Sequence, residues 1–175
     1  MEQLLRLFPA QHALVALVLG VLVAVARYRW RVADDRRGAA IEAGAWGGIA
    51  FGLLLTASIT LVSHTPAAAG TGSVDLVLRS PSLAQALVNL ALFWWVALLL
   101  PLARRTGVTA TTATVVAASI VVELLQWALP TGRSPALMDV LLNTLGGFLL
   151  ALVAVYLVRP AVRLRPTRPA ATIAR

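Results

Sequence analysis

The sequence contains no cysteine and no lysine, and it holds few charges of either sign. Without cysteine the chain has no disulfide framework and no thiolate nucleophile. Charged residues make up 13% of the chain, which is about half of their share in a soluble domain. The sequence also lacks the GxSxG, HExxH and phosphate-loop motifs of common hydrolases and nucleotide-binding enzymes. These absences argue against a secreted disulfide scaffold and against a soluble globular enzyme.

Apolar residues dominate what is present. The chain is 59% hydrophobic with a mean hydropathy of +0.85, and a spanning helix needs about 20 such residues in a row. Five segments meet that requirement: 7–26, 41–62, 83–103, 108–129 and 135–158. We therefore predict an all-α, polytopic bundle of transmembrane helices that forms one domain over 1–158. The Arg- and Pro-rich segment 159–175 is expected to be a disordered tail.

The arginines predict the orientation of the chain. Twelve of the fifteen lie in segments 27–40 and 103–107 and in the C-terminal tail, whereas Arg6, Arg79 and Arg133 lie on the opposite side. The positive-inside rule puts the larger group in the cytoplasm, so the N-terminus is expected outside and the C-terminus inside. The net charge of +8 is then explained by topology and anionic lipid rather than by nucleic acid. The Arg- and Ala-rich composition fits a high-GC bacterium, and a multi-pass protein of this orientation is expected in its cytoplasmic membrane.

Glycines at a spacing of four mark the second segment as a packing helix. Gly44, Gly48 and Gly52 form two overlapping GxxxG motifs, and such glycines let another helix approach closely. Packing within the chain is the favoured interpretation, with a homodimer contact as the alternative, so the oligomeric state stays open. Gly146 and Gly147 suggest a second close contact on the fifth segment.

Polar residues interrupt the last two apolar segments near the turn that joins them. Ser119, Glu123 and Gln126 share one face of the fourth segment, and Asp139 shares a face of the fifth with Asn143. Two helices joined by a short turn are antiparallel neighbours, so these faces can meet. Acids at membrane depth are costly, and they are candidates for function by default.

Two further residues extend this group. Arg133, in the turn, can reach Glu123 or Asp139 and balance their charge. Asn89, near the outer end of the third segment, is expected at the same depth. The candidate ligand-binding set is therefore Asn89, Glu123, Gln126, Arg133, Asp139 and Asn143. A purely structural lock between helices is the alternative, but interhelical polar contacts gain only about 0.6 kcal/mol each.

At these residues the sequence resembles the VanZ-like family of bacterial membrane proteins. The resemblance rests on Glu123-x-x-Gln126, the Pro130 and Gly132-Arg133 turn, Asp139-x-x-x-Asn143-x-x-Gly146 and, upstream, Asn89-x-x-x-Phe93. The chain departs from the family pattern at 95–97, where the family often has a proline-x-glycine step, and at Met138, where it often has an acid. The resemblance implies a cell-envelope protein and a link to resistance against the glycopeptide teicoplanin.

Three functions are consistent with these features. The first is an outward-facing intramembrane site for a lipid headgroup or a lipid-linked cell-wall precursor, with membrane lipids or a glycopeptide as partners. The second is an enzyme that acts on an envelope lipid, with Glu123 and Asp139 as candidate acid and base, or with a cation held between their oxygens. The third is a small transporter or scaffold subunit. We expect no cofactor, no metal site and no nucleic-acid partner.

Overall fold

The computed structural model describes residues 10–32, 36–61, 81–129 and 136–163, and these residues are helical with short connections. The helices are α2 (Ala10–Arg31), α3 (Arg36–Leu61), α4 (Leu83–Leu92), α5 (Trp94–Arg104), α6 (Val108–Ala128) and α7 (Leu137–Val153). A π-helical turn (Ala154–Val158) then leads into α8 (Arg159–Arg163). With α4 and α5 counted as one segment, five helices are long and apolar enough to cross a membrane, so the predicted all-α transmembrane bundle is confirmed.

The helices differ from the predicted segments in several places. Helix α2 continues to Arg31, where the prediction ended at 26, and α3 begins at Arg36, where the prediction began at 41. Segment 159–163, which we assigned to the disordered tail, continues as α8 because the helical backbone runs on through the π turn. The rest of the tail, from 164, lies outside the described residues. The third span, expected as one helix over 83–103, breaks at Phe93, where the backbone leaves the helical region at φ −108° and ψ 21°.

Side chains compensate the break between α4 and α5. The Leu92 carbonyl accepts hydrogen bonds from the Trp95 indole N–H (3.0 Å) and from the Thr56 hydroxyl of α3 (3.4 Å). Backbone groups freed inside a membrane need such partners. Phe93 itself is buried in the central apolar cluster with Trp95 and Val115. The break allows α4 to pack on α7 while α5 packs on α3.

Glycines set the closest helix crossings. A Cβ atom added at Gly20 of α2 would lie 2.8 Å from the Gly47 carbonyl oxygen of α3, so these two backbones are nearly in contact. At Gly48 an added Cβ would lie 2.5 Å from Leu99 of α5, and at Gly52 it would overlap Trp95. Gly44, in contrast, is exposed and an added Cβ would meet nothing within 4 Å. Gly44 therefore lacks the predicted close contact with another described helix. Helix α3 contacts α2 through the face that holds Gly47.

Large apolar side chains cover the outside of the bundle. α2 is the extreme case, since Leu14, Val18 and Leu22 are about half exposed and the other exposed residues between 14 and 26 are also apolar. Such a surface suits lipid and not water. The helices therefore present hydrocarbon outward along their length, and polar groups are confined to the ends and to a few interhelical contacts.

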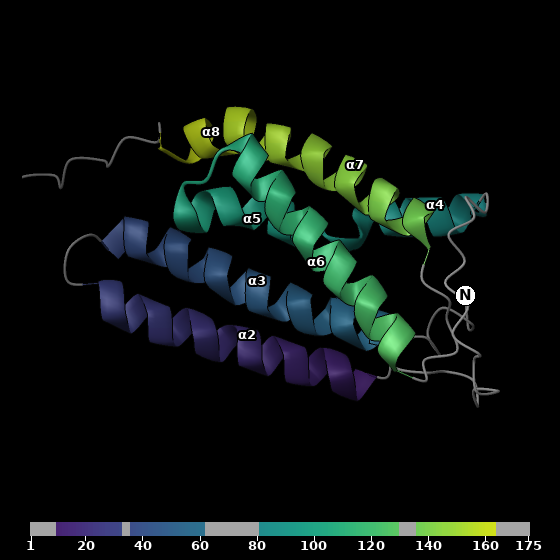
Figure 1. Ribbon diagram of the computed structural model, residues 1–175. Coiled ribbons are helices and arrows are strands. Elements are labelled where there is room, and N and C mark those ends of the chain that lie inside the picture. The colour runs from purple at the N-terminus through teal and green to yellow at the C-terminus, as the bar shows by residue number, and fades with distance from the viewer. Residues whose placement is uncertain (1–9, 33–35, 62–80, 130–135, 164–175) are drawn as a thin grey trace, which may run out of the picture.

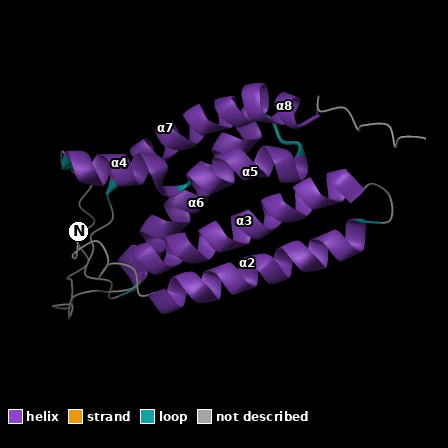
Figure 2. Cartoon of the chain, turned by 180° about the vertical axis from the view of Figure 1, so that it is seen from behind, coloured by secondary structure: helices purple, strands orange, loops and turns teal. Residues whose placement is uncertain are grey.

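The two ends of the bundle carry different residues (Figures 1 and 2). One end holds the end of α2, the start of α3, the connection from α5 to α6, and α8. We call it the basic end, after Arg27, Arg29, Arg31, Arg36, Arg37, Arg104, Arg105 and Arg159. The opposite end holds α4, the end of α6 and the start of α7. We call it the polar end, after Asn89, Ser119, Glu123, Gln126, Asp139 and Asn143.

Candidate intramembrane polar site

A short hydrogen bond joins α4 to α7 at the polar end. The Asn89 side-chain amide donates to the Asp139 carboxylate at 2.6 Å. The two helices can come this close because Gly146, two turns along α7, lies directly against the Leu90 backbone, where an added Cβ would overlap the carbonyl. The break at Phe93 and the glycine on α7 therefore act together to place an amide beside an acid.

Glu123 links the end of α6 to the start of α7. Its carboxylate accepts a hydrogen bond from the backbone N–H of Ala136 at 2.9 Å. Ala136 is the N-cap of α7 and has no capping side chain of its own. A carboxylate there satisfies one of the unpaired N–H groups of the first turn and complements the positive end of the helix dipole. Part of the role of Glu123 is thus to seat α7.

Ser119 and Asn143 form the most deeply buried polar contact. The Asn143 amide donates to the Ser119 hydroxyl at 2.8 Å, and both residues are almost fully buried, at 2% and 0% exposed. The other amide atom, Asn143 Oδ1, is buried and has no hydrogen-bond partner among the residues that the structure describes. Exchanging the oxygen and nitrogen would only move the unsatisfied position to the nitrogen. An unsatisfied buried polar atom is costly and calls for an explanation.

Gln126 is placed differently from the expectation. Its amide donates a hydrogen bond to the Thr60 carbonyl near the end of α3, at 3.3 Å. The Gln126 side chain is buried and links α6 to α3. The last carbonyls of a helix have no partner within it, and Gln126 supplies one. Thr56 and Thr60 are also buried on α3, and the sequence did not lead us to predict a role for them. Their spacing of four residues within an apolar helix was the pattern that could have identified them.

The glycines of α7 lie where the helix contacts two neighbours. Gly146 lies against α4, and an added Cβ at Gly147 would lie 2.7 Å from Val115 on α6. Helix α7 is thus held between α4 and α6, and its polar residues face both. Arg133 and the rest of the 130–135 turn lie outside the described residues, so the expected contact of Arg133 with the acids stays a prediction.

The chemistry open to this site is that of hydrogen bonding and charge. Among the described residues, no group of three His, Cys, Asp or Glu lies close enough to hold a metal ion. Each acid instead accepts from an amide, Asp139 from Asn89 and Glu123 from the backbone of Ala136. Such a set suits recognition of a polar headgroup that brings its own donors and acceptors.

Comparison with known proteins gives a family and nothing narrower. No curated protein and no solved structure matches the chain. The VanZ/LLP1 family model matches residues 13–159, a range that includes every described residue of the polar site. Since this match covers most of its length, the chain belongs to the VanZ/LLP1 family.

Proposed function

We propose that this VanZ-like protein binds a polar lipid headgroup, such as that of a lipid-linked cell-wall precursor, in the polar end of the bundle. The observation that carries the proposal is the buried Asn143 amide, which uses one of its two polar atoms for Ser119 and leaves the other unsatisfied. A helix lock would satisfy both atoms, because an unmade hydrogen bond in the interior costs about 1–3 kcal/mol. A bound headgroup would supply the missing donor.

The surroundings of Asn143 support the same function. Asn89 with Asp139, and Glu123 with the start of α7, bring polar groups from three helices to one end of an otherwise apolar bundle. Lipid covers the outside of these helices, so a lipid can reach the site laterally. The arginine bias supports an outward-facing site in a bacterial cytoplasmic membrane. On this proposal Arg133 would contact the anionic part of the headgroup.

The test uses a variant that should fold but not bind. Ser119→Ala combined with Asn143→Leu removes both partners of the buried hydrogen bond, and replacing both by apolar groups is close to neutral for stability. Thr114→Val is the matched control, since it removes an exposed α6 hydroxyl that bonds only to the Ala110 carbonyl. The probe is a polyprenyl-pyrophosphate-linked disaccharide peptide, added to the purified chain in nanodiscs, with binding followed by native mass spectrometry.

We expect saturable binding by the wild type and by Thr114→Val, and at least tenfold weaker binding by the double variant, as about 1.4 kcal/mol predicts. Teicoplanin susceptibility of cells carrying each variant gives a second readout. Full binding by a well-folded double variant would show that the polar contacts are structural only. Conversion of the bound probe into a product would instead favour an enzyme that uses Glu123 and Asp139.

A further inference from the structure

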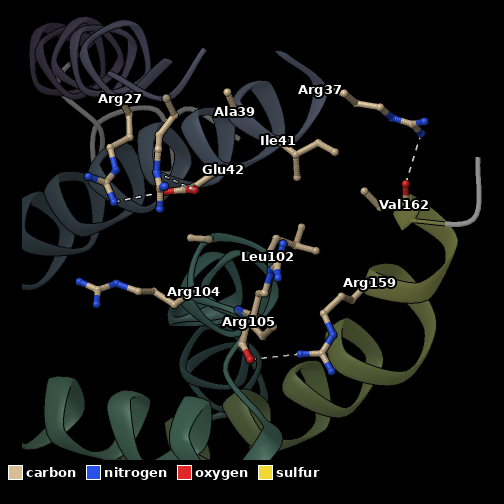
Figure 3. A pocket seen from close by; sticks show the side chains of 14 residues that line it. Arg27, Arg37, Ala39, Ile41, Glu42, Leu102, Arg104, Arg105, Arg159 and Val162 are labelled. Carbon is tan, nitrogen blue, oxygen red and sulfur yellow. Dashed lines mark hydrogen bonds and ion pairs between the residues drawn. The ribbon is translucent and has the colours of Figure 1, made fainter. Parts of the chain in front are cut away.

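A second site lies at the opposite end of the bundle. A pocket of about 890 Å³ opens between the ends of α2, α3, α5 and α8, and Figure 3 shows its side chains. Six arginines line it: Arg27, Arg31, Arg37, Arg104, Arg105 and Arg159. Glu42 is the acidic residue among the described residues of the lining. The sequence predicted that these arginines set the topology and meet anionic lipid, but it could not show that three separate segments surround one cavity.

Interactions within the protein occupy some of these arginines and fix the walls. Arg27 pairs with Glu42 at 3.0 Å, and Arg31 lies 3.6 Å from the same carboxylate. Arg159 of α8 donates to the carbonyl oxygens of Arg105 (3.4 Å) and Thr106 (3.1 Å), so it ties α8 to the end of α5. These contacts hold α2 against α3, and α8 against the end of α5, around one opening.

Arg105 has a different environment. Its backbone is left-handed, with φ 57°, a conformation that non-glycine residues adopt uncommonly. Its guanidinium makes no hydrogen bond or ion pair with the part of the chain that the structure describes, although its backbone is held by Arg159. The pocket therefore has an arginine fork whose donors point to no protein acceptor among the described residues, and phosphate is one of the two anions, with carboxylate, that such a fork binds in a bidentate way.

The remaining wall of the pocket is apolar. Ile41, Leu102 and Val162 line it together with the arginines. A ligand with a charged head and a hydrocarbon body would meet both surfaces, whereas a free inorganic anion would use only the arginines. Basic pockets between transmembrane helices are typical sites for anionic lipid headgroups.

We propose that this basic pocket binds the phosphate of an anionic phospholipid headgroup, with the arginines contacting the phosphate and the apolar wall contacting the glycerol and first acyl carbons. This inference is independent of the function proposed for the polar end. Asp34 and Asp35 lie outside the described residues, in the segment between α2 and α3. With both of them and Glu42 counted, this end would hold three acids and the eight arginines named above, so its net charge would still be positive.

The experiment compares two double variants of the full chain that lose the same charge at the same end. Arg31→Gln with Arg105→Gln removes two pocket arginines. Arg29→Gln with Arg36→Gln removes two exposed arginines that do not line the pocket. Each purified protein in neutral detergent is titrated with phosphatidylglycerol, cardiolipin, phosphatidylcholine or glycerol 3-phosphate. Melting temperature and lipid retention in native mass spectrometry are recorded.

We expect phosphatidylglycerol or cardiolipin, but not phosphatidylcholine, to raise the melting temperature of the wild type. The pocket variant should bind the anionic lipid roughly tenfold or more weakly, and the control variant should stay within about threefold of wild type, since it loses only screened surface attraction. If the pocket variant does not fold, the single Arg105→Gln replaces it, because that side chain bonds to none of the described residues.

Three results would overturn the proposal. Equal losses in the two double variants would mean that charge attracts lipid diffusely and that the pocket binds none. Equal stabilisation by phosphatidylcholine would remove the need for phosphate. Equal stabilisation by glycerol 3-phosphate, at the same concentration, would assign the pocket to a soluble phosphate ester in place of a lipid.

Discussion

At the polar end of the bundle, acids and amides make part-buried or buried contacts between helices, whereas at the basic end, arginines surround an open pocket. Asn143 and Ser119 are 2% and 0% exposed, but the side chains of Arg27 and Arg31 are 39% and 53% exposed. A buried polar group needs a partner, from the fold or from a bound ligand, whereas a group at the water boundary can bond to water in the absence of a ligand. The two ends therefore differ in what their polar residues do for stability.

This difference has an energetic consequence. Removing one partner of a buried hydrogen bond costs about 1–3 kcal/mol, while an exposed ion pair contributes about 0–1 kcal/mol. Removing a single partner of a polar contact at the polar end should therefore lower stability, whereas substitutions at the basic end should mainly weaken binding.

The effect that we expect to be largest concerns which end of the bundle faces the cytoplasm, because a cysteine there is either labelled from outside the cell or not labelled at all. Because the chain has no cysteine, one introduced cysteine reports one position. In intact cells a membrane-impermeant maleimide should label Ser82→Cys at the polar end and should label Gly107→Cys at the basic end only after lysis. Both positions are exposed, and an added Cβ at Gly107 meets nothing within 4 Å. The opposite pattern would place the basic pocket outside the cell.

The next largest effect concerns the contact between α4 and α7. Gly146→Leu should destabilise the protein by about 3 kcal/mol, because its side chain would overlap the Leu90 carbonyl and separate Asn89 from Asp139. Gly44→Leu is the control, since that position is open. Thermal unfolding in detergent measures both. Similar melting temperatures for the two variants would mean that α4 does not rest on Gly146.

A smaller effect is expected for the hydrogen bond between Asn89 and Asp139. Asn89→Leu should cost about 1.5–3 kcal/mol, since it removes an amide donor to a carboxylate. In a double-mutant cycle with Asp139→Leu, the coupling energy should be at least about 0.5 kcal/mol. Gln85→Leu, an exposed amide one turn earlier on α4, should leave the melting temperature near wild type. A coupling energy of zero would mean that the two side chains act independently.

The sequence predicted the helices of this bundle better than it predicted their contacts. Apolar length alone was enough for five spanning helices, and spacing alone put Glu123, Asp139 and Asn143 on facing helices. The break at Phe93 has no proline or glycine to signal it, since it depends on Thr56 from a distant helix and on the Trp95 indole. The partner of Gln126 was missed for the same reason, because its acceptor is a backbone carbonyl on α3.

Glycine patterns show the same limit. The GxxxG spacing marked Gly44, Gly48 and Gly52, yet the α2–α3 crossing is made by Gly20 and Gly47. Spacing tells which residues share a helix face, but only the fold shows which face meets a neighbour. The basic pocket was unpredictable for a related reason: arginine counts report the side of the membrane and not the cavity that the arginines surround.

The smallest effect is expected at Glu42. Its carboxylate pairs with Arg27, and Arg27 and Arg104 lie over the Trp46 ring at 5.6 and 5.2 Å. Because the Arg27 side chain is 39% exposed, Glu42→Gln should cost only about 0.5 kcal/mol, and the amide oxygen can still accept the Arg27 hydrogen bond.

Salt separates this pair from the contacts at the polar end. At about 1 M salt the screening length falls to about 3 Å, so the melting-temperature difference between wild type and Glu42→Gln should shrink. The difference for Asn89→Leu should persist, because the Asn89 amide carries no net charge and its contact with Asp139 is a short, part-buried hydrogen bond. If Glu42→Gln lowered the melting temperature as much as Asn89→Leu does, and independently of salt, the two ends would not differ in the way described above. The Arg27–Glu42–Trp46 cluster would then be part of the structural core.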